Sequence, residues 1–418
     1  MNFDKLTEYL ESLKDSHDVK GLDLIVRKNH GTLYRHMQGY NDYSCRRPVS
    51  EDDLYYLYSC TKIVTVTACM QLVEQGRIGL QDLLSEYLPE FASVRVADGY
   101  EPGDFRNIPD LNAPSHRAER PILIENLLSM TAGLSYDTAS EPIAKLREKS
   151  GNTAGTVEMM SAIARMPLLY EPGERYAYSL GHDVIAAVIE TVSGEKFSNY
   201  VMTHIFEPLG VTDIYFHPGP KEKKRLAAQY SIDFATGKKS PKSDNSFCLT
   251  KEYDSGGAGL IATVNGFSAL LDALACKGMG ANGRRILREE SIRKIGTPLL
   301  SPVQLDDFTV KGMFRPGYSY GLGVRVLADG TKSKSPVGEF GWDGAAGAYA
   351  LIDPKNNISV FYAQEILGMA GVYSEVHPRI RDLVYECIFD ESGLALADQN
   401  SDNPGQFWSG VRRNGTVK

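Results

Sequence analysis

The stretch Leu54-Tyr55-Tyr56-Leu57-Tyr58-Ser59-Cys60-Thr61-Lys62 joins a strand-like apolar run to the start of an apolar helical pattern. The helical pattern continues over residues 63–74 and stops at Gly76. A serine at a helix start and a lysine three positions later lie on one face of the first turn. The helix N-terminus favours a developing alkoxide, and burial can lower the pKa of Lys62 until it acts as a base. The stretch therefore predicts a nucleophilic Ser59 paired with Lys62.

The tetrad Ser-x-x-Lys also begins at Ser193 and at Ser291, so the pattern alone does not identify a site. Ser193 is followed by Gly194 at the end of an apolar helical segment, which is typical of a turn. Ser291 stands among charged residues, which is typical of a solvated helix face. Only Ser59 follows a strand-like run and precedes a helix of buried character, and this context favours it as the functional serine.

Two later segments fit the same site. The segment Pro172-Gly173-Glu174-Arg175-Tyr176-Ala177-Tyr178-Ser179 predicts a turn that leads into an apolar helix over residues 184–192. The segment Phe340-Gly341-Trp342-Asp343-Gly344-Ala345-Ala346-Gly347 precedes two strand-like runs, 348–353 and 358–364, separated by hairpin-forming residues.

A Ser-x-x-Lys tetrad, a Tyr-x-x element and a Gly-rich strand, in this order, resemble the serine β-lactamase and penicillin-binding-protein superfamily. Further segments that look like landmarks of that superfamily are 75–89, 127–134, 205–210 and 256–260. The resemblance covers nearly the whole chain. It implies an α/β chain with the β-lactamase/DD-peptidase-like fold, in which helices flank an antiparallel sheet and a mostly helical lobe is inserted.

The chain is expected to form one catalytic domain over residues 1–392, without a low-complexity linker. We expect an α/β lobe from both chain ends (1–92 and 254–392), a helical lobe (93–253) and a polar, mobile tail (393–418). A hairpin over residues 21–40, turning at Asn29-His30-Gly31, is predicted to join the sheet that holds the strands near 348–364. A final helix, about 378–389, is predicted to pack on that sheet.

The predicted chemistry is acyl transfer through Ser59. Lys62 and the phenol of Tyr178 are the candidate general acid and base, and the sequence leaves open which of them is deprotonated at rest. The backbone N–H of Ser59 and, by resemblance, that of Ala345 are expected to form the oxyanion hole. Gly344 is compatible with close backbone approach at that point.

Departures from the superfamily pattern predict the substrate. The strand carries Trp342-Asp343-Gly344 where enzymes acting on β-lactams or D-Ala-D-Ala peptides usually carry Lys-Thr-Gly, which binds a carboxylate. An Asp would repel that carboxylate unless it points away from the cleft. The second element is Tyr178-Ser179-Leu180 in place of Tyr-x-Asn, and Leu180 cannot hold an amide. Trp342, Asp343, Gly344 and Leu180 are therefore expected to bind substrate, and Trp342 resembles the carboxylesterase and acyltransferase branch; a core-packing Trp342 is the alternative.

Charge, apolar runs and cysteine spacing argue against several classes of partner. A formal net charge of −8 over 418 residues argues against a nucleic-acid or anionic-membrane surface. No membrane-length apolar run and no signal peptide are visible, and six cysteines without paired spacing are expected to be free thiols, so a cytoplasmic protein is predicted. Cys60 is expected to be a small buried residue and His182 a packed or capping one, and no metal or other cofactor is predicted.

The sequence thus predicts a serine carboxylesterase, or an acyltransferase, acting on small esters with apolar parts. Two alternatives stay open: a β-lactamase or D-amino-acid peptidase, and a non-catalytic ligand sensor on the same fold. Natural substrate, acyl-chain length and oligomeric state do not follow from the sequence.

Overall fold

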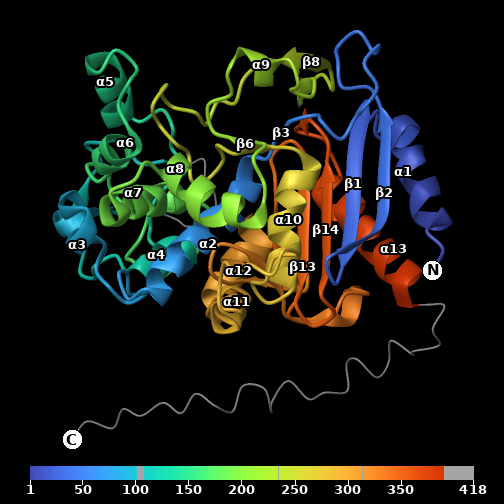
Figure 1. Ribbon diagram of the computed structural model, residues 1–418. Helices are drawn as coiled ribbons and strands as arrows, with labels where there is room; N and C mark the ends of the chain where they lie inside the picture. The colour runs from blue at the N-terminus through green and yellow to red at the C-terminus, as the bar shows by residue number, and fades with distance from the viewer. Residues whose placement is uncertain (101–107, 234, 313–314, 390–418) are drawn as a thin grey trace, which may run out of the picture.

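A seven-stranded antiparallel sheet forms the centre of the fold (Figure 1), with the strand order β10-β11-β12-β13-β14-β1-β2. The computed structural model describes residues 1–100, 108–233, 235–312 and 315–389, so the predicted tail lies outside the described residues. The strands are β1 (Gly21–Lys28), β2 (Gly31–Gly39), β10 (Tyr318–Tyr320), β11 (Arg325–Leu327), β12 (Phe340–Asp343), β13 (Tyr349–Asp353) and β14 (Ile358–Ala363).

The two ends of the chain meet in this sheet. The predicted N-terminal hairpin is confirmed: β1 and β2 are joined by Asn29 and His30, which both have positive φ, at 50° and 69°. Strand β1 pairs with β14, so that Asp23 lies opposite Ala363. A slip of one residue would move Leu22, Leu24 and Val26 from their own apolar cluster to the opposite face, where Ile25 packs, so the side chains on the two faces fix this register.

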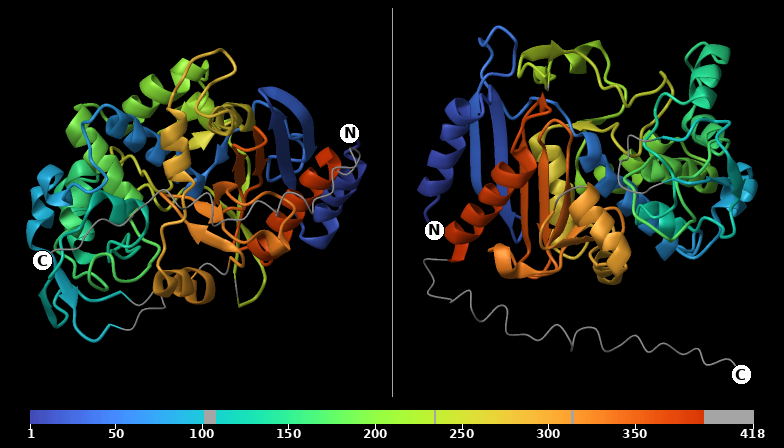
Figure 2. Two further views of the ribbon diagram at one scale, coloured as in Figure 1. Left: turned by 90° about the horizontal axis from the view of Figure 1, so that it is seen from below. Right: turned by 180° about the vertical axis from the view of Figure 1, so that it is seen from behind.

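Helices cover both faces of the sheet. Helices α1 (Asp4–Ser16) and α13 (His377–Phe389) pack on one face, where their apolar residues join a cluster with those of β1 and β14. Helix α10 (Val264–Ala275) packs against the other face, as the opposite views in Figures 1 and 2 show. The predicted fold class, with helices flanking an antiparallel sheet, is confirmed.

A mostly helical part of the chain lies beside the sheet (Figure 1). Its helices are α3 (Leu84–Tyr87), α4 (Ile124–Leu128), α5 (Glu141–Lys149), α6 (Thr156–Ile163), α7 (Gly181–Ser193), α8 (Phe197–Val201) and α9 (Pro220–Lys223). Two more short helices precede β10, α11 (Glu289–Ile295) and α12 (Pro302–Asp306). The smaller strands are β3 (Tyr55–Tyr56), β4 (Arg95–Ala97), β5 (Ser115–Arg117), β6 (Ile214–Tyr215), β7 (Gln229–Ile232), β8 (Lys239–Lys242), β9 (Ile261–Ala262) and β15 (Ile366–Leu367).

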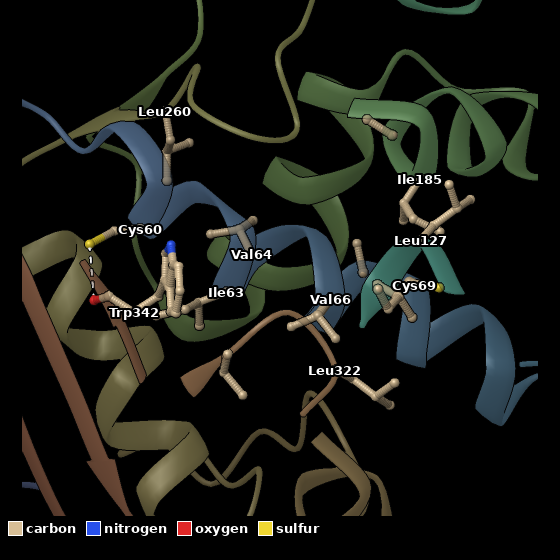
Figure 3. Packing of buried hydrophobic residues seen from close by; sticks show 14 of the residues in the cluster. Cys60, Ile63, Val64, Val66, Cys69, Leu127, Ile185, Leu260, Leu322 and Trp342 are labelled. Atoms are coloured by element: carbon tan, nitrogen blue, oxygen red, sulfur yellow. Dashed lines mark hydrogen bonds between the residues drawn. The ribbon is translucent and has the colours of Figure 1, made fainter. Parts of the chain in front are cut away.

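Helix α2 (Thr61–Glu74) joins the helical part to the sheet. Every residue from Thr61 to Leu72 is buried, which explains why the helix has apolar residues on all sides instead of one stripe. Figure 3 shows its side chains packed between the strand that carries Trp342 and the helices that carry Leu127 and Ile185. In the part of the chain that the structure describes, no helix is long and apolar enough to cross a membrane.

Candidate active site

Ser59 lies in a 3-10 turn, η1 (Tyr58–Cys60), immediately before α2. The sequence placed Ser59 in the first turn of the helix, whereas the helix begins at Thr61. Tyr58 has a φ of 44°, a left-handed conformation that is uncommon for a bulky residue. Tyr58 and Cys60 are fully buried while Ser59 reaches the surface, so the turn presents this one side chain to solvent.

Lys62 is the fully buried partner of Ser59. Its Nζ lies 3.3 Å from Ser59 Oγ and donates a 2.8 Å hydrogen bond to the carbonyl oxygen of Gly257. Burial lowers the pKa of Lys62 to about 7, and the negative charge of Asp183 opposes this shift. At neutral pH, a substantial fraction of Lys62 is therefore the free amine, which can accept a proton.

Tyr178 contacts Ser59 from the other side. Its hydroxyl donates a 2.7 Å hydrogen bond to Ser59 Oγ, and Lys62 Nζ lies 4.6 Å from the centre of its ring. Burial raises the pKa of Tyr178 well above its usual value, although hydrogen bonds from its neighbours oppose the shift. The directions of the two pKa shifts make Tyr178 a neutral phenol at rest and Lys62 the group that deprotonates first.

Trp342 holds Tyr178 in place. Its indole Nε1 donates a 3.1 Å hydrogen bond to the Tyr178 hydroxyl, and the two rings stack with centroids 5.7 Å apart. Trp342 is only 1% exposed and lies in the core beside Cys60 and Ile63 (Figure 3). The expectation that Trp342 offers apolar surface to a substrate is wrong, because the core already covers the ring. The alternative expectation, that Trp342 packs in the core, fits the structure.

The segment after Trp342 approaches the Ser59 turn closely. A Cβ on Gly344 would stand 2.5 Å from the carbonyl oxygen of Leu57, so only glycine fits there. The hydroxyl of Tyr373 donates a 3.0 Å hydrogen bond to the Gly344 carbonyl, which fixes the strand end. Ala345, the next residue, is partly exposed, as is Ser59.

Asp343 and Leu180 do not join this cluster. Successive strand residues point to opposite faces, so Trp342 faces Tyr178 while Asp343 faces Arg315 and Arg325, forming ion pairs with both. Burial alone would raise the pKa of Asp343, but the two guanidinium groups hold it well below its usual range. The predicted repulsion of a substrate carboxylate by Asp343 is therefore wrong. Leu180 is 3% exposed and belongs to the core, so the structure does not bring it to the cleft.

Tyr136 is a site residue that the sequence analysis missed. Its ring stacks on Tyr178 at 5.3 Å between centroids, and Lys62 Nζ lies 5.4 Å from the ring centre. Burial raises the pKa of Tyr136, and its interaction with the Ser59 hydroxyl opposes this. Phe247 packs edge-on against Tyr136 at 5.6 Å. Tyr136 stands two positions after the segment 127–134, which resembles the superfamily, and this position was the indication that the sequence offered for it.

Asp183 is the second missed residue, and it supports the Lys62 site from behind. Its carboxylate accepts hydrogen bonds from the Tyr253 hydroxyl (2.6 Å), the Ser255 hydroxyl (2.7 Å) and the Gly257 N–H (3.2 Å). Because the Gly257 carbonyl accepts from Lys62, Asp183 positions the backbone oxygen that orients the amine. No spacing rule in the sequence points to this residue.

Cys60 and the possible metal ligands among the described residues are distinct from the groups that contact Ser59. Cys60 is fully buried, its thiol points to the carbonyl of Trp342 at 3.5 Å, and burial raises its pKa. Among the described residues, His30, Asp272 and Cys276 bring three possible metal-ligand atoms within 4.8 Å of one another, and this trio contains no residue of the Ser59 cluster.

Comparisons with known proteins show what the chain as a whole is similar to. The Beta-lactamase family model matches residues 6–384. Protein Rv1367c of Mycobacterium tuberculosis is 28% identical over 371 residues, covering 87% of this chain and 90% of that protein. Esterase EstB of Burkholderia gladioli is 26% identical over 402 residues, which cover 90% of this chain and 93% of that protein. The solved structure of EstCE1, a hydrolase with promiscuous acyltransferase activity, matches with a TM-score of 0.72 and 25% sequence identity. The match covers 91% of this chain and 98% of that chain.

The chain belongs to the beta-lactamase family. The predicted superfamily and the predicted enzyme class, a serine hydrolase, are confirmed at this level.

The buried position of Trp342 predicts how a Trp342→Phe variant behaves. Phe keeps most of the ring contact but removes the N–H that Tyr178 accepts, so kcat should fall about 10-fold, equivalent to ~1.4 kcal/mol, with little change in KM. Steady-state kinetics with p-nitrophenyl butyrate measure both constants. The matched control is Tyr320→Phe, because that ring packs against Trp342 at 5.0 Å and its buried hydroxyl has no partner among the described residues. A raised KM at unchanged kcat would instead mean that Trp342 contacts the substrate.

The ion pairs behind β12 predict a stability effect for Asp343→Asn. Removing the charge leaves two buried guanidinium groups without their shared partner, so the free energy of unfolding should fall by about 3 kcal/mol. Urea denaturation measures this change. The control Asp15→Asn alters an exposed residue of α1 and should stay within ~0.5 kcal/mol of the wild type. Equal stability of the two variants would contradict the assigned pairing.

Proposed function

We propose that this protein is a carboxylesterase that cleaves small neutral esters through an acyl-enzyme on Ser59. The observation that carries the proposal is the convergence of Lys62 Nζ and the Tyr178 hydroxyl on one oxygen, Ser59 Oγ, at 3.3 Å and 2.7 Å. Two proton-transfer groups with pKa values shifted in opposite directions around a serine are what acyl transfer requires.

The first half-reaction forms the acyl-enzyme. Neutral Lys62 accepts the proton of Ser59 while Oγ attacks the ester carbonyl, and the oxyanion is bound by the backbone N–H groups of Ser59 and Ala345. Tyr178 then donates its proton to the leaving alcohol and regains one from the Lys62 ammonium, which lies over its ring. The ester C–O bond breaks, an alcohol leaves, and Ser59 carries the acyl group.

The second half-reaction returns the enzyme. A water loses its proton to the same pair of groups, attacks the acyl carbonyl and releases the carboxylic acid, and Ser59 Oγ takes the proton back. Transfer to an alcohol in place of water is the second candidate, and it is favoured by the similarity to EstCE1, described as having acyltransferase activity.

Preference for neutral esters is supported by the described side chains around Ser59. Around Ser59, the described side chains that reach the surface include Tyr136, Tyr178 and Phe247, whereas Lys62 is fully buried. A substrate carboxylate would find no cation among these exposed side chains, which disfavours anionic β-lactams and peptides. The six cysteines, all within the described residues, form no disulfide, and this supports a reducing compartment such as the cytoplasm as the proposed location.

A comparison of Ser59→Ala with Cys60→Ala tests the nucleophile. Ser59→Ala should abolish ester turnover and labelling by a fluorophosphonate probe, whereas Cys60→Ala should keep most of both. The wild type should hydrolyse p-nitrophenyl butyrate with a kcat/KM at least ~10²-fold above that for nitrocefin, since about 3 kcal/mol is what an unpaired charged contact costs.

Full labelling of Ser59→Ala would show that another residue is the nucleophile. Equal turnover of nitrocefin and the ester would replace the esterase proposal with the β-lactamase alternative. One-step acylation of Ser59 without turnover of any ester would favour the ligand-sensor alternative.

The lowered pKa of Lys62 predicts the pH dependence. Only the free amine accepts the Ser59 proton, so kcat/KM should rise as the pH rises through about 7, where burial places the Lys62 pKa. Initial rates with a neutral ester between pH 5 and 9 measure the profile. Tyr178→Phe should lower the plateau by at least ~10²-fold while keeping the inflection. An inflection near the usual lysine value of about 10.4 would contradict this assignment of the base.

A further inference from the structure

A cavity of about 200 Å³ lies on the face of the sheet opposite Ser59, between β11, β13 and the start of α13. Its cationic lining residues are Arg315, Arg325, Lys332 and Arg381. Its aromatic lining residues are Tyr318, Tyr349 and Tyr373. Among the described residues that line it, none is acidic. None of these side chains belongs to the Ser59 cluster, so the cavity calls for a separate explanation.

The carboxylates behind the lining leave an excess of positive charge. Arg315 and Arg325 share the single carboxylate of Asp343. Glu339 lies 3.8 Å from Arg325, and Arg381 pairs with Asp382 at 2.8 Å. Lys332 is exposed and forms no ion pair with the described residues. The three guanidinium groups are thus matched by three carboxylates, and the ammonium of Lys332 is the excess positive charge that attracts anions.

Arg315 provides a second, independent observation. It is 6% exposed, and it binds Asp343 and the Tyr373 carbonyl, at 3.2 Å for the latter, through its two terminal nitrogens. Its Nε has no hydrogen-bond partner among the described residues. A buried donor without an acceptor costs about 1–3 kcal/mol, and a small shift of the Arg315 side chain toward the cavity that it lines would let an oxyanion supply the acceptor.

We propose that this cavity is a binding site for a small oxyanion of the phosphate class, free or as the head of a phosphate monoester. A volume of about 200 Å³ far exceeds the ~10–15 Å³ that one water needs, yet lies below the ~300–1,000 Å³ of sites for drug-sized ligands. Guanidinium groups bind tetrahedral oxyanions through paired N–H donors, and Lys332 at the rim adds a mobile point charge.

The proposed site touches residues that hold the strand end beside Ser59. Arg315 donates to the carbonyl of Tyr373, and the Tyr373 hydroxyl donates to the carbonyl of Gly344. The site itself is defined by charge and shape alone, so it stands whether or not the protein hydrolyses esters.

The test is a titration of the full-length protein with inorganic phosphate at constant ionic strength, followed by calorimetry and thermal unfolding. We expect saturable one-to-one binding and a rise in Tm with phosphate concentration. Lys332→Glu should weaken binding at least ~10-fold, because it reverses a charge at the rim. Lys223→Glu makes the same charge change on the exposed end of α9 and should bind as the wild type does.

Absence of saturable binding, or equal binding by Lys332→Glu and Lys223→Glu, would overturn the proposal. Glycerol phosphate and succinate are titrated in the same way as inorganic phosphate. Tighter binding of glycerol phosphate than of inorganic phosphate assigns the site to a phosphate monoester, and equal binding assigns it to the phosphate group alone. Succinate binding as tightly as either phosphate would refute selectivity for the phosphate class.

Discussion

The amine of Lys62 is enclosed by protein on all sides, and the chemistry of the site depends on that burial. An ammonium in water holds its proton up to a pKa of about 10.4, too high for a base at neutral pH. Helix α2 is packed from all directions, so Lys62 loses its hydration and its pKa falls to about 7. Because the folded pKa lies below the unfolded one, the unfolded state binds more protons between these values. Lys62 therefore destabilises the fold increasingly as the pH falls from about 10 to 7.

Polar contacts outside the cleft offset part of the free-energy cost of burying Lys62. Asp183 orders the backbone of Gly257, whose carbonyl accepts from the Lys62 amine, and the negative charge of Asp183 partly opposes the pKa shift. On the other side of Ser59, strand β12 uses both of its faces. Trp342 faces inward and donates to Tyr178, and Asp343 faces outward into two ion pairs. The strand that positions the phenol is thus anchored by charges behind it.

The sequence predicted those features that local patterns encode. Turn residues at Asn29-His30-Gly31 and at 353–357 marked the two hairpins, and the placement of Ser59 between a strand and a helix marked the proposed nucleophile. The contacts that it could not predict join distant residues. Lys62 and Gly257 are 195 positions apart, and Tyr178 and Trp342 are 164 positions apart. No local pattern encodes which partner a buried polar group finds across such a separation, so Asp183 and Tyr136 were missed.

The error on Asp343 has a different origin. Strand alternation places Trp342 and Asp343 on opposite faces, so both could not line one cleft. The proposed preference for neutral esters does not depend on Asp343, because a different argument supports it. A base must be neutral to accept a proton, and the burial that neutralises Lys62 also removes a cation in contact with Ser59 that could attract a carboxylate. At the strand position where relatives acting on β-lactams carry a lysine, the buried indole of Trp342 offers a single N–H, and Tyr178 already accepts it. Basicity of the site and the proposed preference for neutral substrates therefore share one physical cause.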